Sequence, residues 1–352
     1  MKICVVGAGA IGGLIGAKMA LAGEDVTLIA RGEHLAVIRE KGLKLIMGDG
    51  TEHVAKNIRA TDSYEEAGQQ DIVFLALKAH QIAGIAKKMR ALFGPDTMVV
   101  TLQNGIPFWY FSRHGGPHEG HRLETVDPTG EVAANIEPER IIGSVVFPAA
   151  VKSAPGVITH IEGNRFPVGE LDGQETDRVK LVAETFTKAG FKSFVLDNIR
   201  AEIWLKLWGN LSFNPISAVT HSTLVDICQF PLTRDLAANM MTEAAEVAGK
   251  LGISFRVPLE KRIDGAEKVG KHKTSMLQDV EAGRPLELDP VMGAVVELGR
   301  LTDTPTPHID ALYSCVKLLD KMMADEKVYV RAAPLEAAAQ APSVANATAP
   351  SA

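Results

Sequence analysis

The 352-residue sequence predicts two domains, an α/β domain built on a doubly wound parallel sheet and an all-helical domain after it. A glycine-rich turn follows the first apolar segment, and apolar segments alternate with helical patterns up to about residue 198. Strand patterns then stop, and only long helical patterns follow. We expect domains at residues 1–198 and 199–331, with residues 106–140 forming a surface excursion of the first. Residues 332–352 are rich in Ala and Pro, and we expect this tail to be disordered.

Composition narrows the class of protein. The apolar content of 46% can fill two cores, and the net charge of −6 argues against nucleic acid or an anionic membrane as the main partner. Cys4, Cys228 and Cys315 lie far apart, which suits a reducing compartment. The sequence contains no apolar run of about 18 residues, and a strand pattern starts at residue 2, where a signal peptide would lie. We therefore expect a cytoplasmic protein with no membrane partner.

The first strand pattern, residues 2–6, runs directly into Gly7-Ala8-Gly9-Ala10-Ile11-Gly12 and then into a helical pattern over residues 14–21. This G-x-G-x-x-G spacing is typical of Rossmann-type dinucleotide-binding domains. Gly7 permits the tight turn, Gly9 lets a pyrophosphate approach the backbone, and Gly12 lets the helix pack closely on the strand. Free N–H groups at the helix start would bind the phosphates.

The second strand, residues 25–30, ends without the acidic residue that usually binds the ribose hydroxyls of NAD. Arg31 follows it instead. A guanidinium can bind a 2′-phosphate through charge-assisted hydrogen bonds, so the sequence favours NADP over NAD. The alternative is that Arg31 is an ordinary solvated surface residue.

Further strands end at polar residues. A poorly patterned stretch, residues 32–67, contains strand-like pieces at 43–47 and 58–60, and clearer elements follow as a strand at 71–77, a helix at 81–92 and a strand at 98–102. Lys78 follows one of these strands, and Asn104 follows another. Ligands of doubly wound sheets bind beyond the carboxyl ends of the strands. We therefore expect the glycine loop, Arg31, Lys78 and Asn104 to face one ligand.

The excursion at 106–140 contains His114, His118 and His121. Three histidines in eight residues invite a metal-site interpretation, but a glycine-rich loop does not hold ligand geometry, and we predict no metal. The first domain then closes with strand-like segments at 141–151, 156–161 and 165–170, a helix at 175–189 and a strand at 193–196.

The predicted helices of the second domain cover residues 201–219, 232–251, 259–282, 290–302 and 307–323. The first of them is strongly apolar, yet it carries Lys206, Asn210 and Asn214 at a spacing of four, which places them on one narrow stripe. One interpretation is a polar helix edge that faces the other domain. The sharper one is that the stripe lines a cleft, where a desolvated lysine could act as a general acid.

Ser275 and Glu287 form a further candidate pair. Ser275 could donate a hydrogen bond to a carboxylate, and Glu287 could orient a lysine. Each also has a simpler interpretation, as a routine helix hydroxyl and as a first-turn carboxylate, and the spacing alone does not separate the two.

In this order, the motifs resemble those of the ketopantoate reductases (2-dehydropantoate 2-reductases). The matching pieces span residues 1 to about 320: Gly7-x-Gly9-x-x-Gly12, Arg31, Leu77-Lys78-Ala79, Gln103-Asn104-Gly105, Lys206-x-x-x-Asn210-x-x-x-Asn214-Pro215, Ser275-Met276-Leu277-Gln278-Asp279 and Gly283-Arg284-Pro285-x-Glu287. The resemblance implies a Rossmann domain, a helical domain like that of 6-phosphogluconate dehydrogenase, and NADPH between them. It implies reduction of 2-dehydropantoate to pantoate, in pantothenate and coenzyme A biosynthesis.

The resemblance also implies roles for single residues. The glycine loop (Gly7 to Gly12) would hold the pyrophosphate and Arg31 the 2′-phosphate, with Lys78 beside the adenosine half and Asn104 beside the nicotinamide and the substrate. Lys206 would be the general acid, and Glu287 would hold it and the substrate hydroxyl. Asn210, Asn214 and Ser275 would bind the 2-keto acid.

Other functions remain open at this point. Residues 220–224 lack an asparagine that family members often carry there, so a reductase of another 2-keto acid is an alternative. An NADPH-binding sensor without chemistry is a second, and a protein whose helical domain chiefly forms a homodimer is a third. Neither of the two functions without catalysis explains why a lysine lies inside an apolar helix and is accompanied by Ser275 and Glu287.

Overall fold

Within residues 1–335, the part of the chain that the computed structural model describes, every strand lies before residue 170. The strands are β1 (Lys2–Val6), β2 (Asp25–Ile29), β3 (Leu43–Ile46), β4 (Glu52–Ala55), β5 (Ile58–Thr61), β6 (Gln70–Leu75), β7 (Phe93–Thr101), β8 (Ile141–Ser144), β9 (Ala149–Ala154), β10 (Val157–Glu162) and β11 (Val168–Gly169). The predicted tail at 332–352 lies almost entirely outside the described residues.

The helices divide between the two domains. Those of the first are α1 (Ala10–Leu21), α2 (Gly32–Lys41), α3 (Tyr64–Ala67), α4 (Ala79–Met89), α5 (Glu131–Asn135) and α6 (Asp177–Lys188), with 3₁₀ turns η1 (Arg90–Leu92) and η2 (Pro138–Arg140). Those of the second are α7 (Ile199–Thr220), α8 (Leu224–Gln229), α9 (Pro231–Lys250), α10 (Leu259–Lys268), α11 (Ser275–Glu281), the π-helical turn η3 (Asp289–Gly293), α12 (Ala294–Leu301) and α13 (Pro307–Glu326).

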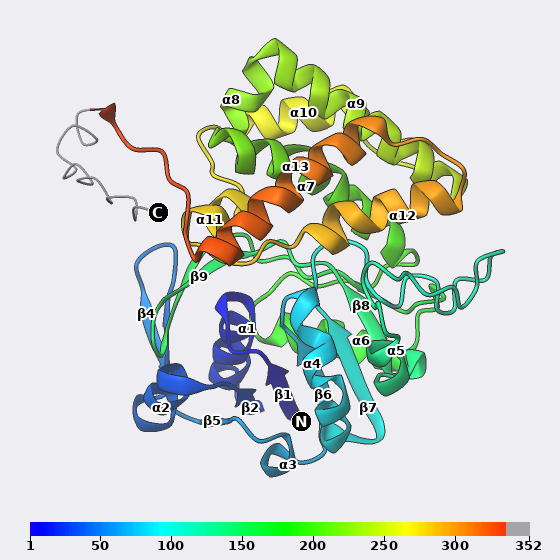
Figure 1. Ribbon diagram of the computed structural model, residues 1–352. Coiled ribbons are helices and arrows are strands. Elements are labelled where there is room, and N and C mark those ends of the chain that lie inside the picture. Colours follow the sequence, from blue (N-terminus) through cyan, green and yellow to red (C-terminus); the bar gives the residue numbers. More distant parts are fainter. Residues whose placement is uncertain (336–352) are drawn as a thin grey trace, which may run out of the picture.

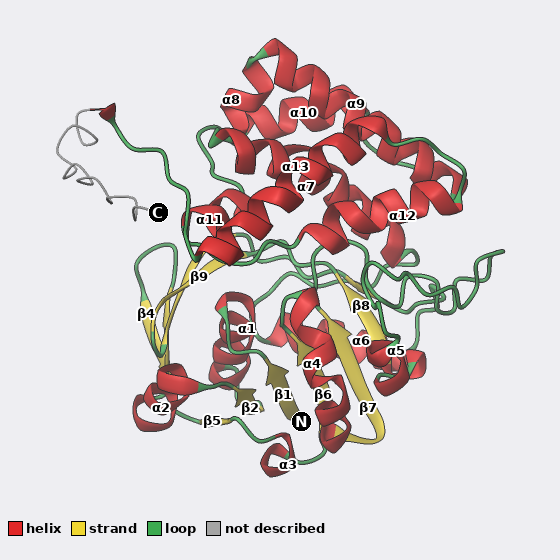
Figure 2. Ribbon diagram, viewed as in Figure 1, coloured by secondary structure: helices red, strands yellow, loops and turns green. Residues whose placement is uncertain are grey.

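The central sheet has the order β11-β8-β7-β6-β1-β2-β5. From β8 to β5 neighbouring strands run parallel, and β11 pairs antiparallel with β8. The sequence runs outward from β1 in both directions, so the sheet is doubly wound. Figure 2 shows the strands confined to one part of the molecule and the other part built from helices. The predicted fold class, α/β followed by all-α, is therefore confirmed.

A second sheet, with the order β4-β3-β10-β9, covers the outer side of α1. α1 is apolar all round, and such a helix is stable only when it is buried all round. It contacts β1 and β2 of the central sheet on one side and β3, β4, β9 and β10 on the other (Figure 1). The approach is close, because a Cβ atom on Gly13 would lie 2.7 Å from the side chain of Ile158 in β10.

The helical domain is organised around α7, which contacts α8, α9, α11 and α13. Asn198 caps this helix, its side-chain oxygen accepting a hydrogen bond from the Ala201 N–H at 3.0 Å. Pro215 lies inside the helix, which continues to Thr220. The core of this domain is continuous with side chains under the central sheet, including Cys4 and Val6 of β1.

The segment 106–140 differs from the predicted surface excursion, because it begins in the core. Trp109, Tyr110 and Phe111 are fully buried, and the Trp204 indole of α7 donates to the Tyr110 hydroxyl at 2.7 Å. The buried Arg200 guanidinium donates to the Tyr110 carbonyl at 2.7 Å. Three consecutive aromatic residues are unusual in a solvent-exposed loop. Here they are buried and contact α7, so they join the two domains.

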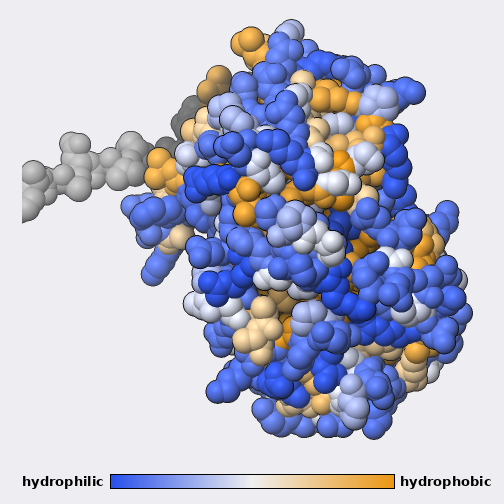
Figure 3. All heavy atoms as spheres, turned by 90° about the vertical axis from the view of Figure 1, so that its right-hand side faces the viewer, coloured by the Kyte–Doolittle hydropathy of each residue, from blue (hydrophilic) through white to orange (hydrophobic). Residues whose placement is uncertain are grey.

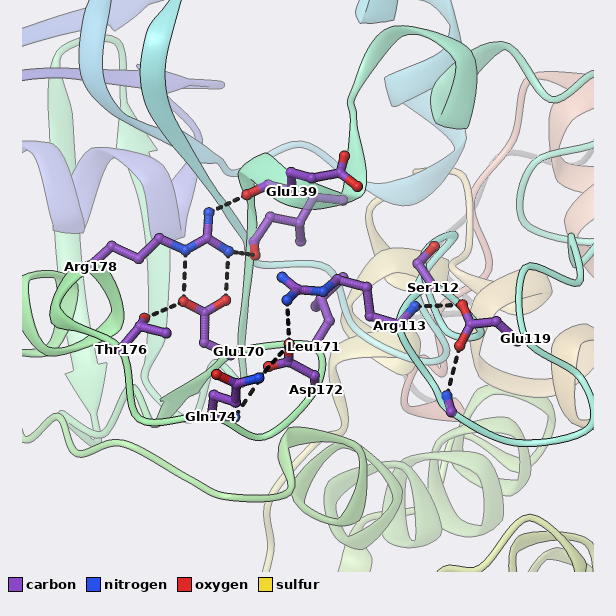
Figure 4. Close-up of polar contacts among 12 residues, drawn as sticks. Ser112, Arg113, Glu119, Glu139, Glu170, Leu171, Asp172, Gln174, Thr176 and Arg178 are labelled. Carbon is purple, nitrogen blue, oxygen red and sulfur yellow. Dashed lines mark hydrogen bonds and ion pairs between the residues drawn. The ribbon is translucent and has the colours of Figure 1, made fainter.

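The outer part of this segment is held by surface ion pairs and turns. Arg113 pairs with Asp172, and the Glu119 carboxylate accepts from the Arg113 N–H at 2.7 Å (Figure 4). Beside them, Arg178 makes a bidentate pair with the buried Glu170, at 2.6 and 2.5 Å. Figure 3 shows the face on this side of the molecule as mostly hydrophilic, with hydrophobic residues in small, separate patches.

Several predicted elements differ from the structure. The predicted helix 259–282 is two helices, because Gly270 takes a positive φ of 79° and Thr274 caps the start of α11. The predicted strand 141–151 is split between two sheets around Pro148, which has no N–H to donate. The predicted strand 193–196 makes only an isolated bridge, Val195 to Val168. Helices α2, α3, α5 and α8 were not predicted.

Candidate active site

The glycine loop between β1 and α1 is shaped by backbone hydrogen bonds. The N–H groups of Gly7 and Ala8 donate to the Ile29 carbonyl of β2 at 3.3 and 3.2 Å, and Gly7 takes a φ of 102° that favours glycine. A Cβ atom on Gly12 would lie 2.0 Å from the Gly7 carbonyl oxygen, so the turn closes only with glycine there. Gly9 is exposed, and a Cβ on it would meet no atom within 4 Å. The loop and the start of α1, which includes Ala10 and Ile11, thus leave an open side where a pyrophosphate fits.

Arg31 lies at the same edge of the sheet. It follows β2, whose Ile29 carbonyl holds the glycine loop, and it flanks the start of α2 with its side chain exposed. A guanidinium there is free to approach a phosphate on the ribose of a dinucleotide bound along the loop.

The central contact of the site joins Lys206, Asn104 and Glu287. The Lys206 ammonium of α7 donates to the Asn104 Oδ1 at 2.6 Å, and the Asn104 amide nitrogen donates to the Glu287 carboxylate at 3.1 Å. An ammonium can only donate and an ionised carboxylate can only accept, so these two neighbours fix the orientation of the Asn104 amide. Lys206 also donates to the Val146 carbonyl, in the turn between β8 and β9.

Glycine lets the Asn104 loop reach the helical domain. Gly105 has a φ of 83°, and a Cβ atom on it would lie 2.2 Å from the Pro290 carbonyl oxygen of η3. The next N–H, of Ile106, donates to that carbonyl at 2.8 Å. The loop after β7 therefore docks directly on η3, two residues beyond Glu287.

Burial sets the acidity of Lys206. Desolvation lowers the pKa of Lys206 to about 8, against a smaller opposing effect of the Glu287 charge. A lysine near this pKa is partly protonated at neutral to mildly alkaline pH and can exchange a proton with a bound ligand.

A small pocket, open to solvent, lies beside this contact. It is lined by Asn104, Asn210, Asn214, Ser275, Met276, Asp279, Glu287 and Val291. Five of these are residues that the sequence singled out, so the structure brings the amide stripe of α7 together with Ser275 and Glu287. Ser275 is exposed at the start of α11, and Asn214 is buried.

Two predicted contacts differ in detail. Glu287 was expected to hold Lys206 directly, but the Asn104 amide bonds to both of them and lies between them, and the Glu287 charge acts on the lysine across it. Lys78 crosses between the domains, where it pairs with Asp279 at 2.8 Å and donates to the Pro285 carbonyl at 2.9 Å. Asp279 also accepts from Arg284 at 2.7 Å, which makes this buried carboxylate the centre of a charged cluster.

Sequence reasoning missed Asp279, Met276, Val291 and the Val146 carbonyl. Asp279 lies four residues after Ser275, on the same face of α11, and that spacing could have identified it. A backbone carbonyl leaves no such trace in a sequence, because any residue can supply it.

The histidines of the 106–140 segment surround the Phe111 ring. The ring centroids of His114, His118 and His121 lie 5.2, 5.5 and 5.6 Å from it. No group of three or more His, Cys, Asp or Glu residues in the described part of the chain is arranged to hold a metal ion. Between residues 1 and 335, no helix is both long enough and apolar enough to cross a bilayer.

Comparison with known proteins identifies the family of the chain. Residues 3–173 match the family "Ketopantoate reductase PanE/ApbA", and residues 198–320 match "Ketopantoate reductase PanE/ApbA C terminal". A 2-dehydropantoate 2-reductase of Mesorhizobium japonicum is 53% identical over 320 residues, covering 91% of this chain and 98% of its own.

Solved structures share the whole fold. One from Ralstonia solanacearum is 37% identical with a TM-score of 0.87, covering 92% of this chain and 98% of that one. The structure of 2-dehydropantoate 2-reductase from Methylococcus capsulatus is 28% identical with a TM-score of 0.78, with the same coverage. The two family matches and the 53% identical relative show that this chain belongs to the ketopantoate reductase family.

Proposed function

We propose that this chain reduces 2-dehydropantoate to pantoate with NADPH, the reductive step of pantothenate biosynthesis. The Lys206–Asn104 hydrogen bond of 2.6 Å carries the proposal, because it holds an ammonium beside a pocket of amide and hydroxyl groups at the carboxyl edge of a nucleotide-binding sheet. The name of the 53% identical relative supports the substrate. A binding sensor would have no use for a half-buried lysine with a lowered pKa.

The cofactor of the proposed reaction is a nicotinamide dinucleotide, bound along the glycine loop. The open side at Gly9 and the closed turn at Gly7 fit the pyrophosphate, and the exposed Arg31 favours NADPH over NADH. When bound, this cofactor supplies a hydride to the 2-keto carbon. The chain itself binds, orients and protonates the substrate.

Lys206 is the proposed proton donor. As the keto oxygen gains negative charge, a nearby ammonium stabilises it and transfers its proton. Asn104 holds the ammonium in place, and Glu287 fixes the Asn104 amide from the other side. The neutral amides of Asn210 and Asn214 and the Ser275 hydroxyl supply hydrogen bonds to the 2-keto acid. Lys78 holds Asp279 of the pocket lining at 2.8 Å, so its proposed role is to join the two domains beside the pocket.

The proposal also covers the oligomeric state and the cellular location of the enzyme. Exposed apolar side chains on the α8–α10 side, Phe230, Leu232 and Val269, support a homodimer formed through the helical domain. Three free cysteines, Cys4, Cys228 and the exposed Cys315, support a cytoplasmic location.

The proposed reaction is tested by following NADPH absorbance with a panel of 2-keto acids. We expect the largest kcat/KM with 2-dehydropantoate, because the pocket offers hydrogen-bonding groups for a carboxylate and a hydroxyl as well as for the keto group. Boiled enzyme and an unreactive 2-hydroxy acid are the controls. If another 2-keto acid is reduced more efficiently, the reaction class stands and the substrate is wrong.

The cofactor preference depends on Arg31. We expect Arg31→Ala to lose about 1.5–3 kcal/mol of NADPH binding, the value of a hydrogen bond to a charged group, with little change for NADH. The measurement is the dissociation constant of each cofactor by fluorescence titration. Equal affinity of the unmodified protein for the two cofactors would contradict the role of Arg31.

The pH dependence of keto-acid reduction should be determined by the protonation of Lys206. Because only the ammonium form donates a proton, kcat/KM for the keto acid should be level below about pH 8 and fall about tenfold per pH unit above it. Oxidation of pantoate needs the neutral amine, so its rate should rise through the same pH. A reduction rate that is level well above about pH 8 would show that Lys206 is not the titrating donor.

A further inference from the structure

His34, in α2, links the glycine loop to the second sheet. The ring is buried, with 8% of the side chain exposed. Its Nε2 lies 2.8 Å from the Ala8 carbonyl oxygen, and its Nδ1 lies 2.8 Å from the Gly156 nitrogen in the turn between β9 and β10. His34 itself lies outside the glycine motif and outside the lining of the amide pocket, but it contacts Ala8 of the glycine loop.

The two partners determine the protonation of the ring. A carbonyl only accepts, so Nε2 must carry a hydrogen, and a backbone N–H only donates, so Nδ1 must be bare. His34 is therefore the neutral Nε2–H tautomer. Burial lowers the pKa of His34. The hydrogen bond to the Ala8 carbonyl acts in the opposite direction and the Lys152 charge adds a smaller lowering, so the net effect favours this neutral form.

The Gly156 end of the contact is rigid. Gly156 has a φ of 71°, a Cβ atom on it would lie 2.4 Å from the Val37 side chain, and its carbonyl accepts from the Lys44 N–H of β3 at 2.9 Å. The turn is thus fixed to the second sheet and to α2, so the His34 ring is an anchored donor rather than a mobile one.

The Ala8 end determines the direction of a cofactor-binding group. The Ala8 carbonyl and the Gly9 N–H belong to one planar trans peptide, in which they point in opposite directions. His34 holds the carbonyl on the inner side, so the Gly9 N–H is turned toward the opposite side. Gly9 is exposed, and among the described residues its N–H has no hydrogen-bond acceptor, so this N–H is available to a ligand.

We propose that His34 is a positioning residue for the cofactor: by holding the Ala8 carbonyl, it aims the Gly9 N–H at the pyrophosphate. The inference rests on the proposed dinucleotide binding at the glycine loop. Without the His34 bond the Ala8–Gly9 peptide could rotate, and binding would then include the loss of that freedom. The His34 imidazole thereby connects the second sheet, at Gly156, to the glycine loop, at Ala8.

Two substitutions separate the ends of the contact. His34→Gln extends an amide to the Nε2 position, where it can still donate to the Ala8 carbonyl. His34→Asn reaches only the Nδ1 position and keeps the Gly156 contact alone. The measurements are the NADPH dissociation constant of the full-length chain by fluorescence titration, and kcat and KM for keto-acid reduction. His53→Asn, at an exposed histidine of β4, is the matched control.

We expect His34→Asn to weaken NADPH binding about tenfold, as for one lost hydrogen bond, and His34→Gln to remain within about threefold of the unmodified protein. kcat at saturating NADPH should hardly change in either variant. The inference is overturned if His34→Asn binds NADPH normally, or if His34→Gln loses as much as His34→Asn, which would indicate ring packing. If the unmodified protein fails to bind NADPH, the proposed function is wrong as well.

Discussion

The amide of Asn104 joins the two domains of this protein at the point where chemistry is proposed. It accepts from Lys206 at 2.6 Å and donates to Glu287 at 3.1 Å, so one neutral side chain connects an ammonium and a carboxylate from the helical domain. Leaving a buried ammonium without partners costs several kcal/mol, and the Asn104 oxygen and the Val146 carbonyl offset that cost. The ammonium is retained with a lowered pKa rather than neutralised outright.

Much of the surrounding architecture serves to bring these groups together. Gly105 allows the loop after β7 to touch η3, which sets Asn104 beside Glu287. The chain leaves the central sheet after β8 and enters the second sheet at β9, and the turn between them presents the Val146 carbonyl to Lys206. On the other side of the sheet, α1 is enclosed between two sheets, which fixes the glycine loop at its start. Contacts between the two sheets and the helical domain thus position both the glycine loop and Lys206.

The sequence was most informative where local pattern and chemistry coincide. The glycine loop, the Lys206 stripe on an apolar helix, and the change from alternating elements to helices all follow from residue type and period, and they predicted the fold class correctly. Contacts between distant segments were less predictable. The bridging role of Asn104, the pairing of Lys78 with Asp279 and the bond from His34 to Ala8 join residues up to 201 positions apart. The break in the predicted helix 259–282 was readable from Gly270 and Thr274, whereas α2 has only a few buried positions, including Leu35 and Ile38, and is stabilised by tertiary packing.

The most direct test of this account is the turnover of Lys206→Met, which keeps an apolar stem of similar length in α7 but removes the ammonium. With saturating NADPH and 2-dehydropantoate, kcat should fall by about 10²–10⁴, the usual contribution of general acid catalysis. The NADPH dissociation constant should stay at the value of the unmodified protein, because the lysine ammonium bonds to Asn104 and to the Val146 carbonyl and to no residue of the glycine loop. Near-normal turnover, or a loss explained entirely by weaker NADPH binding, would contradict the assignment of Lys206 as the proton donor.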